Sequence, residues 1–88
     1  MEDHLIIQLF LERSESAVLE LARKYGGVCR SIARNILKKS EEAEECFNDT
    51  LLAVWNAIPP ERPDKLQPYV CRIARNLSLK KYHSKTAQ

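Results

Sequence analysis

Acidic side chains crowd one short stretch of this 88-residue chain, and basic side chains crowd two others. Residues 41–49 contain five acids and no base, whereas residues 21–40 and residues 65–88 each contain six basic residues and no acid. The formal net charge of +2 hides this segregation. Because separated charge patches attract partners of opposite sign, we expect the chain to contact one cationic and one anionic partner. Solvated helix faces are the other interpretation.

The sequence CRIARNLSL, at residues 71–79, has side chains suited to nucleic acid. Arginine and lysine neutralise phosphates, and asparagine presents a donor and an acceptor together to a base edge. On a helix, one outward stripe and the tail that follows it carry Arg72, Arg75, Asn76, Leu79, Lys80, Lys81, His83 and Lys85. The earlier IARN at residues 32–35 has different flanks, and we interpret it as scaffold. The hypothesis of base reading therefore rests on Asn76.

The cysteines and histidines form no catalytic or metal-binding pattern. Cys29, Cys46 and Cys71 lack C-x-x-C spacing and fall on or near apolar stripes. His4 and His83 are near opposite ends of the chain. We therefore expect reduced, mostly buried cysteines, no metal or other cofactor, no small-molecule substrate and no enzymatic activity.

Helical periodicity predicts an all-α bundle of four helices that positions these side chains, at about residues 3–12, 15–38, 41–57 and 66–82. Four prolines between residues 59 and 68 predict a stiff loop before the last helix. Gly26 and Gly27 predict a kink or a close helix contact in the second helix. After Tyr82 the sequence HSKTAQ has no apolar partner, so we expect the end to fray.

The length of the chain fits one small domain. The apolar run at residues 5–11 follows acids instead of a basic segment, and it is too short to span a bilayer. We therefore expect a cytoplasmic protein without a membrane partner.

Two longer patterns resemble region 2 of bacterial RNA polymerase sigma factors of the extracytoplasmic-function type. Those proteins carry D-A-E-D-x-x-Q-E-x-F-x-x-x-W and then W-L-x-R-I-A-R-N-x-x-x-D. Here EEAEECFNDTLLAVW at residues 41–55 is similar to the first, and YVCRIARNLSLKKY at residues 69–82 is similar to the second. The resemblance covers residues 3 to about 82. It implies a single region 2 domain, without the region 4 helix-turn-helix domain of complete members.

In that family the acidic helix binds the clamp helices of the polymerase β′ subunit. The resemblance assigns this role to one face of the third helix, formed by Glu42, Glu45, Asn48 and Asp49 with Leu52 as an apolar neighbour. Like charges one turn apart repel weakly on an isolated helix, so an acid-only face contributes little to stability by itself. A cationic partner explains its presence.

The family's last helix and the loop before it hold the non-template strand of the −10 promoter element, with one base flipped out of the duplex. The resemblance places Asn76 in the base pocket and residues 60–66, which include Arg62 and Lys65, in its wall. It assigns phosphate contacts to Arg72, Arg75 and Lys80. Leu79 and His83 complete the DNA-facing stripe.

Two alternatives stay open from the sequence. A helical DNA-binding regulator that is not a sigma factor explains the basic stripes but not the acidic helix. The second alternative is a protein interaction module, such as the target of an anti-sigma protein, and it is also compatible with the sigma interpretation. Preference for single-stranded or for duplex promoter DNA distinguishes a sigma domain from an ordinary regulator.

Overall fold

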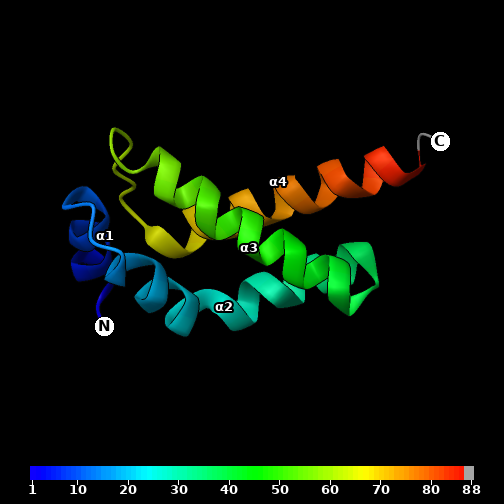
Figure 1. Ribbon diagram of the computed structural model, residues 1–88, viewed down its shortest axis with the longest axis horizontal. Helices are drawn as coiled ribbons and strands as arrows, with labels where there is room; N and C mark the ends of the chain where they lie inside the picture. The colour runs from blue at the N-terminus through cyan, green and yellow to red at the C-terminus, as the bar shows by residue number, and fades with distance from the viewer. Residues whose placement is uncertain (87–88) are drawn as a thin grey trace.

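The computed structural model describes residues 1–86 and shows four α-helices in this part of the chain, without a strand (Figure 1). The helices are α1 (Asp3–Leu11), α2 (Ser16–Leu37), α3 (Ser40–Ala57) and α4 (Leu66–Thr86). Helices α2, α3 and α4 run along the long axis, each antiparallel to the one before it (Figure 1). The predicted all-α bundle of four helices is confirmed.

The main core lies where the three long helices meet α1. Its members are apolar residues from every helix: Ile6, Ile7, Phe10, Ala17, Leu21, Tyr25, Cys29, Phe47, Val54, Ile58, Leu66, Tyr69, Val70 and Ala74. A smaller cluster of Ala33, Leu37, Ala43 and Cys46 closes the other end of the bundle. Burial of these apolar surfaces supplies most of the driving force for folding.

The short helix α1 is fixed to its neighbours by polar contacts. The Tyr25 hydroxyl donates to both carboxylate oxygens of Asp3, at 2.7 and 2.8 Å. In the turn after α1, Arg13 Nη1 donates to the main-chain oxygens of Trp55 and Ile58, at 2.6 and 2.8 Å. The Arg13 guanidinium also lies 3.7 Å from the centroid of the Trp55 ring. Arg13 therefore satisfies carbonyls at the end of α3 that have no partner within the helix.

The glycine pair lies in an unbroken α2. Gly26 is buried, and a Cβ atom added there would lie 3.3 Å from the Phe47 ring of α3. The same atom at exposed Gly27 would meet nothing within 4 Å. The sequence predicted either a kink or a close helix contact at this glycine pair. The structure shows the close helix contact, and it occurs at Gly26.

The cysteines are free thiols, as expected, and Cys29 and Cys46 are buried. Burial, the largest cause, raises the pKa of Cys29 to about 11. Cys46 lies between α3 and α4, where its Sγ atom is 3.1 Å from Ser78 Oγ. Ser78 in turn donates to the main-chain oxygen of Ala74. These contacts hold the second half of α4 against α3.

The expected fraying is wrong for residues 83–86, because α4 continues to Thr86 instead of ending near residue 82. Residues 87 and 88, to which the same expectation applied, lie outside the described part of the chain. The last turns of α4 reach α3 through ion pairs, in which Lys81 Nζ lies 2.7 Å from Glu45 and Lys85 Nζ lies 2.6 Å from Glu42. The other helix boundaries differ from the expected ones by one residue at most.

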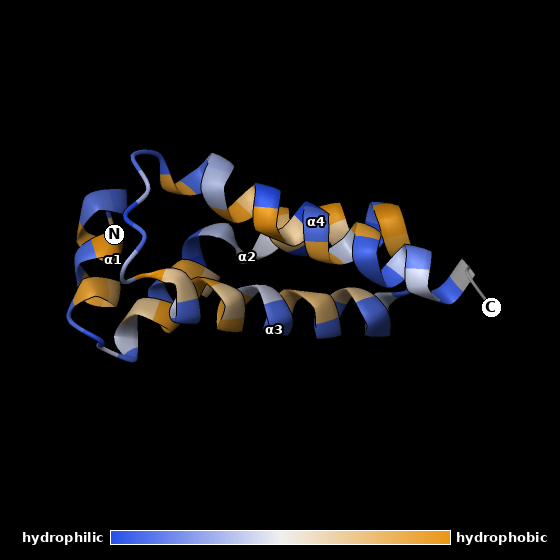
Figure 2. Ribbon diagram, turned by 90° about the horizontal axis from the view of Figure 1, so that it is seen from above, coloured by the Kyte–Doolittle hydropathy of each residue, from blue (hydrophilic) through white to orange (hydrophobic). Residues whose placement is uncertain are grey.

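The segment between α3 and α4 is predominantly hydrophilic (Figure 2). It is anchored by Tyr69, whose hydroxyl donates to Glu61 at 2.9 Å. Within residues 1–86, no helix has the length and apolar character that crossing a membrane requires.

Candidate functional site

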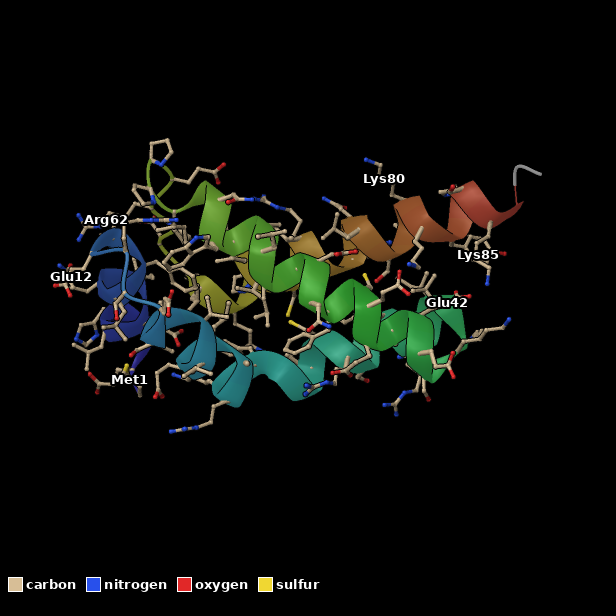
Figure 3. All side chains as sticks on the ribbon, in the orientation of Figure 1. Met1, Glu12, Glu42, Arg62, Lys80 and Lys85 are labelled. Atoms are coloured by element: carbon tan, nitrogen blue, oxygen red, sulfur yellow. The ribbon has the colours of Figure 1, made fainter. Side chains whose placement is uncertain are left out.

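The acidic face of α3 divides into a paired part and an open part. Glu45 Oε1 accepts a hydrogen bond from Lys81 at 2.7 Å, and Glu42 Oε1 accepts one from Lys85 at 2.6 Å. Figure 3 shows Glu42 and Lys85 at the same end of the bundle. Asn48 and Asp49 are exposed, and their side chains make no hydrogen bond with the described residues. The predicted acidic face therefore exists, but lysines of α4 already pair with two of its three carboxylates.

These pairs change the charge balance of the face. The hydrogen bond from Lys85 is the largest influence on Glu42, and it holds the pKa of that carboxyl below its usual value. The corresponding bond to Glu45 raises the pKa of Lys81. Outside the predicted set, Glu44 pairs with Arg30 of α2 at 2.8 Å. Three acids of residues 41–49 therefore have cationic partners within the domain, supplied by α2 and α4.

Beside the open part of the acidic face, α2 and α3 form a shallow apolar groove of about 500 Å³. Leu51, Leu52 and Trp55 line it from α3, Val18 and Leu19 line it from α2, and Glu15 lines it from the turn before α2. Leu52 is 57% exposed and Leu19 is 65% exposed. Leu52, predicted from the resemblance, therefore has an apolar neighbour on α2 that the sequence analysis did not identify.

The predicted DNA-facing residues lie along the loop and α4. Most of them have exposed side chains, namely Arg62, Lys65, Arg72, Arg75, Asn76, Lys80 and His83, whereas Leu79 is half-buried. Figure 3 places Arg62 near the end of the bundle where Met1 lies, and Lys80 toward the other end. The set therefore forms a long stripe instead of one compact pocket.

A shallow depression of about 380 Å³ lies where the loop meets α4. Pro63, Asp64, Lys65, Pro68, Tyr69 and Arg72 line it. The Arg72 guanidinium lies 5.9 Å from the centroid of the Tyr69 ring. The structure thus brings Lys65 and Arg72 together, and it places Asn76 outside this lining, one turn further along α4.

A second groove, of about 630 Å³, runs between α3 and α4 and separates the two predicted surfaces. Asp49 and Leu52 line it from α3, and Lys80 and Lys81 line it from α4. The side chains assigned to a cationic partner and those assigned to an anionic partner therefore face each other across one groove.

Comparison with known families assigns the chain to one of them. The model of the family described as sigma-70 region 2 matches residues 21–88, well over half of the chain. The chain belongs to the sigma-70 region 2 family. Neither the search of curated proteins nor the search of solved structures returned a match.

Membership gives the region 2 domain a general role in promoter recognition by a sigma factor. This role implies contact with core RNA polymerase and with promoter DNA, and it is not an enzymatic one. The fold and the family of the sequence analysis are thus both confirmed at this level.

The sequence analysis missed the internal pairing of two of its basic residues. Lys81 and Lys85 were grouped with the basic tail, and their pairing with Glu45 and Glu42 was not foreseen. The spacing of these residues could have indicated the pairing. Two acids three residues apart on one helix can form ion pairs with two lysines four residues apart on an antiparallel neighbour. Recognising it requires the register of α3 against α4, which the sequence alone does not give.

Proposed function

We propose that this chain is the promoter-recognition domain of a sigma factor of the extracytoplasmic-function type, acting in the bacterial cytoplasm. Its α3 face binds the β′ clamp helices of RNA polymerase, and its loop and α4 bind the non-template strand of the −10 element. The observation that carries the proposal is the placement of an exposed acidic and apolar face on α3 beside an exposed basic stripe on α4.

The polymerase surface is supported by the combination of groups on α3. Asn48 and Asp49 are exposed beside Leu52, which opens onto the apolar groove. Protein interfaces typically have an apolar centre surrounded by polar groups. A basic helix with apolar side chains on one face therefore fits this part of the domain.

The promoter surface is supported by the cations along α4 and in the loop. Exposed Arg72, Arg75 and Lys80 are spaced along one helix, as contacts to successive phosphates require. The depression beside Tyr69 and Lys65 offers a wall against which an unstacked base can lie. Unstacking costs a few kcal/mol, which such contacts must recover.

Charge reversal tests the polymerase surface. We expect Asp49→Lys to weaken binding of a β′ clamp-helix fragment in a pull-down, with little change in melting temperature. Glu41→Lys is the matched control, because it reverses an exposed charge on the same helix outside the predicted face. Equal effects of both variants would contradict the assignment of the surface.

Oligonucleotide titration tests the promoter surface. We expect the domain to prefer the unpaired non-template strand, and Asn76→Ala to reduce base selectivity. Lys80→Ala should weaken all sequences alike and lower the salt slope by about one unit. Preference for duplex DNA would instead favour an ordinary helical regulator. If Asn76→Ala unfolds the domain, Asn76 has a structural role and its assignment to the base pocket is wrong.

A further inference from the structure

The end of α4 is tied to the acidic face by two short ion pairs. Lys81 reaches Glu45 at 2.7 Å and Lys85 reaches Glu42 at 2.6 Å. The acids lie in the first half of α3, and the lysines lie in the last two turns of α4. Two residues of the proposed polymerase surface are therefore occupied by cations of the same domain.

The arrangement around Glu42 is more enclosed than an ordinary surface pair. Its side chain is 19% exposed, and its Oε2 atom is buried without a hydrogen-bond partner among the described residues. Lys85 binds only the other oxygen, Oε1. Glu42 thus keeps an acceptor that a further cation can use once Lys85 moves.

We propose that Lys81 and Lys85 are internal competitors for the polymerase surface, which release Glu45 and Glu42 to a cationic partner and then bind DNA phosphates. This inference rests on the proposed function. In the free domain Lys81 pairs with Glu45 and Lys85 pairs with Glu42. In the complex with polymerase and promoter, both lysines contact DNA phosphates.

The exchange is energetically accessible. Ion pairs near a protein surface contribute little net free energy, because solvation of the separated charges compensates for most of the attraction. Such pairs can therefore be replaced without unfolding the bundle, whose α3–α4 contact also includes the buried Cys46 and Ser78.

Release of the lysines extends the basic stripe. Lys80 is exposed on the turn of α4 that also carries Lys81, and it points away from the bundle in Figure 3. Two freed ammonium groups add to it on the same helix. Polymerase binding therefore strengthens binding of DNA, and by linkage DNA strengthens binding of polymerase by the same factor.

The test compares two double variants of the domain. Lys81→Gln with Lys85→Gln removes the competitors but keeps the helix-forming tendency of α4. Arg75→Gln with Lys80→Gln is the control, because it removes two exposed positive charges from the same helix that have no acid partner among the described residues. Circular dichroism verifies that both variants keep their helices.

Affinity for a β′ clamp-helix fragment at low salt is the first measurement. We expect Lys81→Gln/Lys85→Gln to bind about 2- to 30-fold more tightly than the control, as expected for two surface ion pairs. The gain should diminish at high salt because screening weakens the masking pairs. If the affinity of Lys81→Gln/Lys85→Gln for the fragment rises no more than that of the control, the proposal of internal competition is overturned.

Enhancement of DNA binding is the second measurement. Addition of the fragment should increase the affinity of the unmodified domain for the non-template strand, and this increase should vanish in Lys81→Gln/Lys85→Gln. An unchanged increase in that variant overturns the transfer of the lysines to DNA. Failure of every variant to bind the fragment overturns the proposed function itself, and the inference with it.

Discussion

The adjacent glycines of α2, Gly26 and Gly27, allow the same substitution by alanine to be tested at a crowded position and at an open one. A Cβ atom at Gly26 would lie 3.0 Å from Arg30 Nη1 and 3.3 Å from Phe47 Cζ. At Gly27 it would meet nothing within 4 Å. Both positions lie inside the same helix, so the gain in helical propensity is equal for the two alanine variants.

The magnitudes follow from these contacts. Replacement of glycine by alanine inside a helix stabilises it by about 1 kcal/mol, and we expect Gly27→Ala to show this gain. At Gly26 the new methyl group crowds the Phe47 ring, which is 3% exposed, and the Arg30 guanidinium that stacks on it. Overpacking of this kind costs about 1–3 kcal/mol. We therefore expect Gly26→Ala to be neutral or destabilised by up to about 2 kcal/mol.

Thermal unfolding followed by circular dichroism measures the difference. For a domain of this size, 1 kcal/mol corresponds to about 4–8 °C in melting temperature. Gly27→Ala should melt above the unmodified domain by about that amount, while Gly26→Ala should melt at or below it. An equal rise in both variants would refute the close approach of α2 and α3 at Gly26.

Two further predictions concern backbone strain and alkaline pH. Lys38 ends α2 with φ at 66°, so Lys38→Gly should relieve strain and stabilise the domain by about 0.5–1 kcal/mol in urea unfolding. Arg13 has φ at 58°, but Arg13→Gly should destabilise, because it removes the guanidinium from two carbonyls at the end of α3. Burial first, and then a carboxylate hydrogen bond, raise the pKa values of Tyr25 and Tyr69 to about 12. The phenol groups of Tyr25 and Tyr69 therefore bind their protons more tightly in the folded state than in the unfolded state. Their contribution to the free energy of unfolding should be complete below about pH 10 and be lost as the pH rises to about 12. Urea unfolding across this range measures the loss. In Tyr69→Phe part of that loss should disappear.

The secondary structure was predictable because helical periodicity is a local property. Apolar residues at three- and four-residue spacing located all four helices, and the prolines located the loop. The end of α4 was not predictable in the same way. Residues 83–86 have no apolar stripe, and the ion pairs of Lys81 and Lys85 with α3 are tertiary contacts. Rules that consider only neighbouring residues in the sequence cannot predict such contacts.

The candidate site was predictable in its residue types but not in its internal pairing. The acid run and the basic stripe are visible in the sequence, and both are on the surface. Whether two charges neutralise each other depends on how one helix is placed against another, which only the packed core determines. The same limit applies to the depression beside Tyr69, because its lining combines the loop with the first turns of α4.

Internal pairing also narrows the proposed polymerase surface. Glu42, Glu44 and Glu45 each have a cation from α2 or α4, so they offer a partner less charge than their number suggests. Asp49 forms no ion pair with the described residues, and it lies on the same helix as Leu52, which is exposed on the rim of an apolar groove. Interfaces derive most of their binding energy from a few such desolvated contacts. The centre of the proposed interface therefore lies at the middle of α3, and the paired acids lie nearer the beginning of that helix.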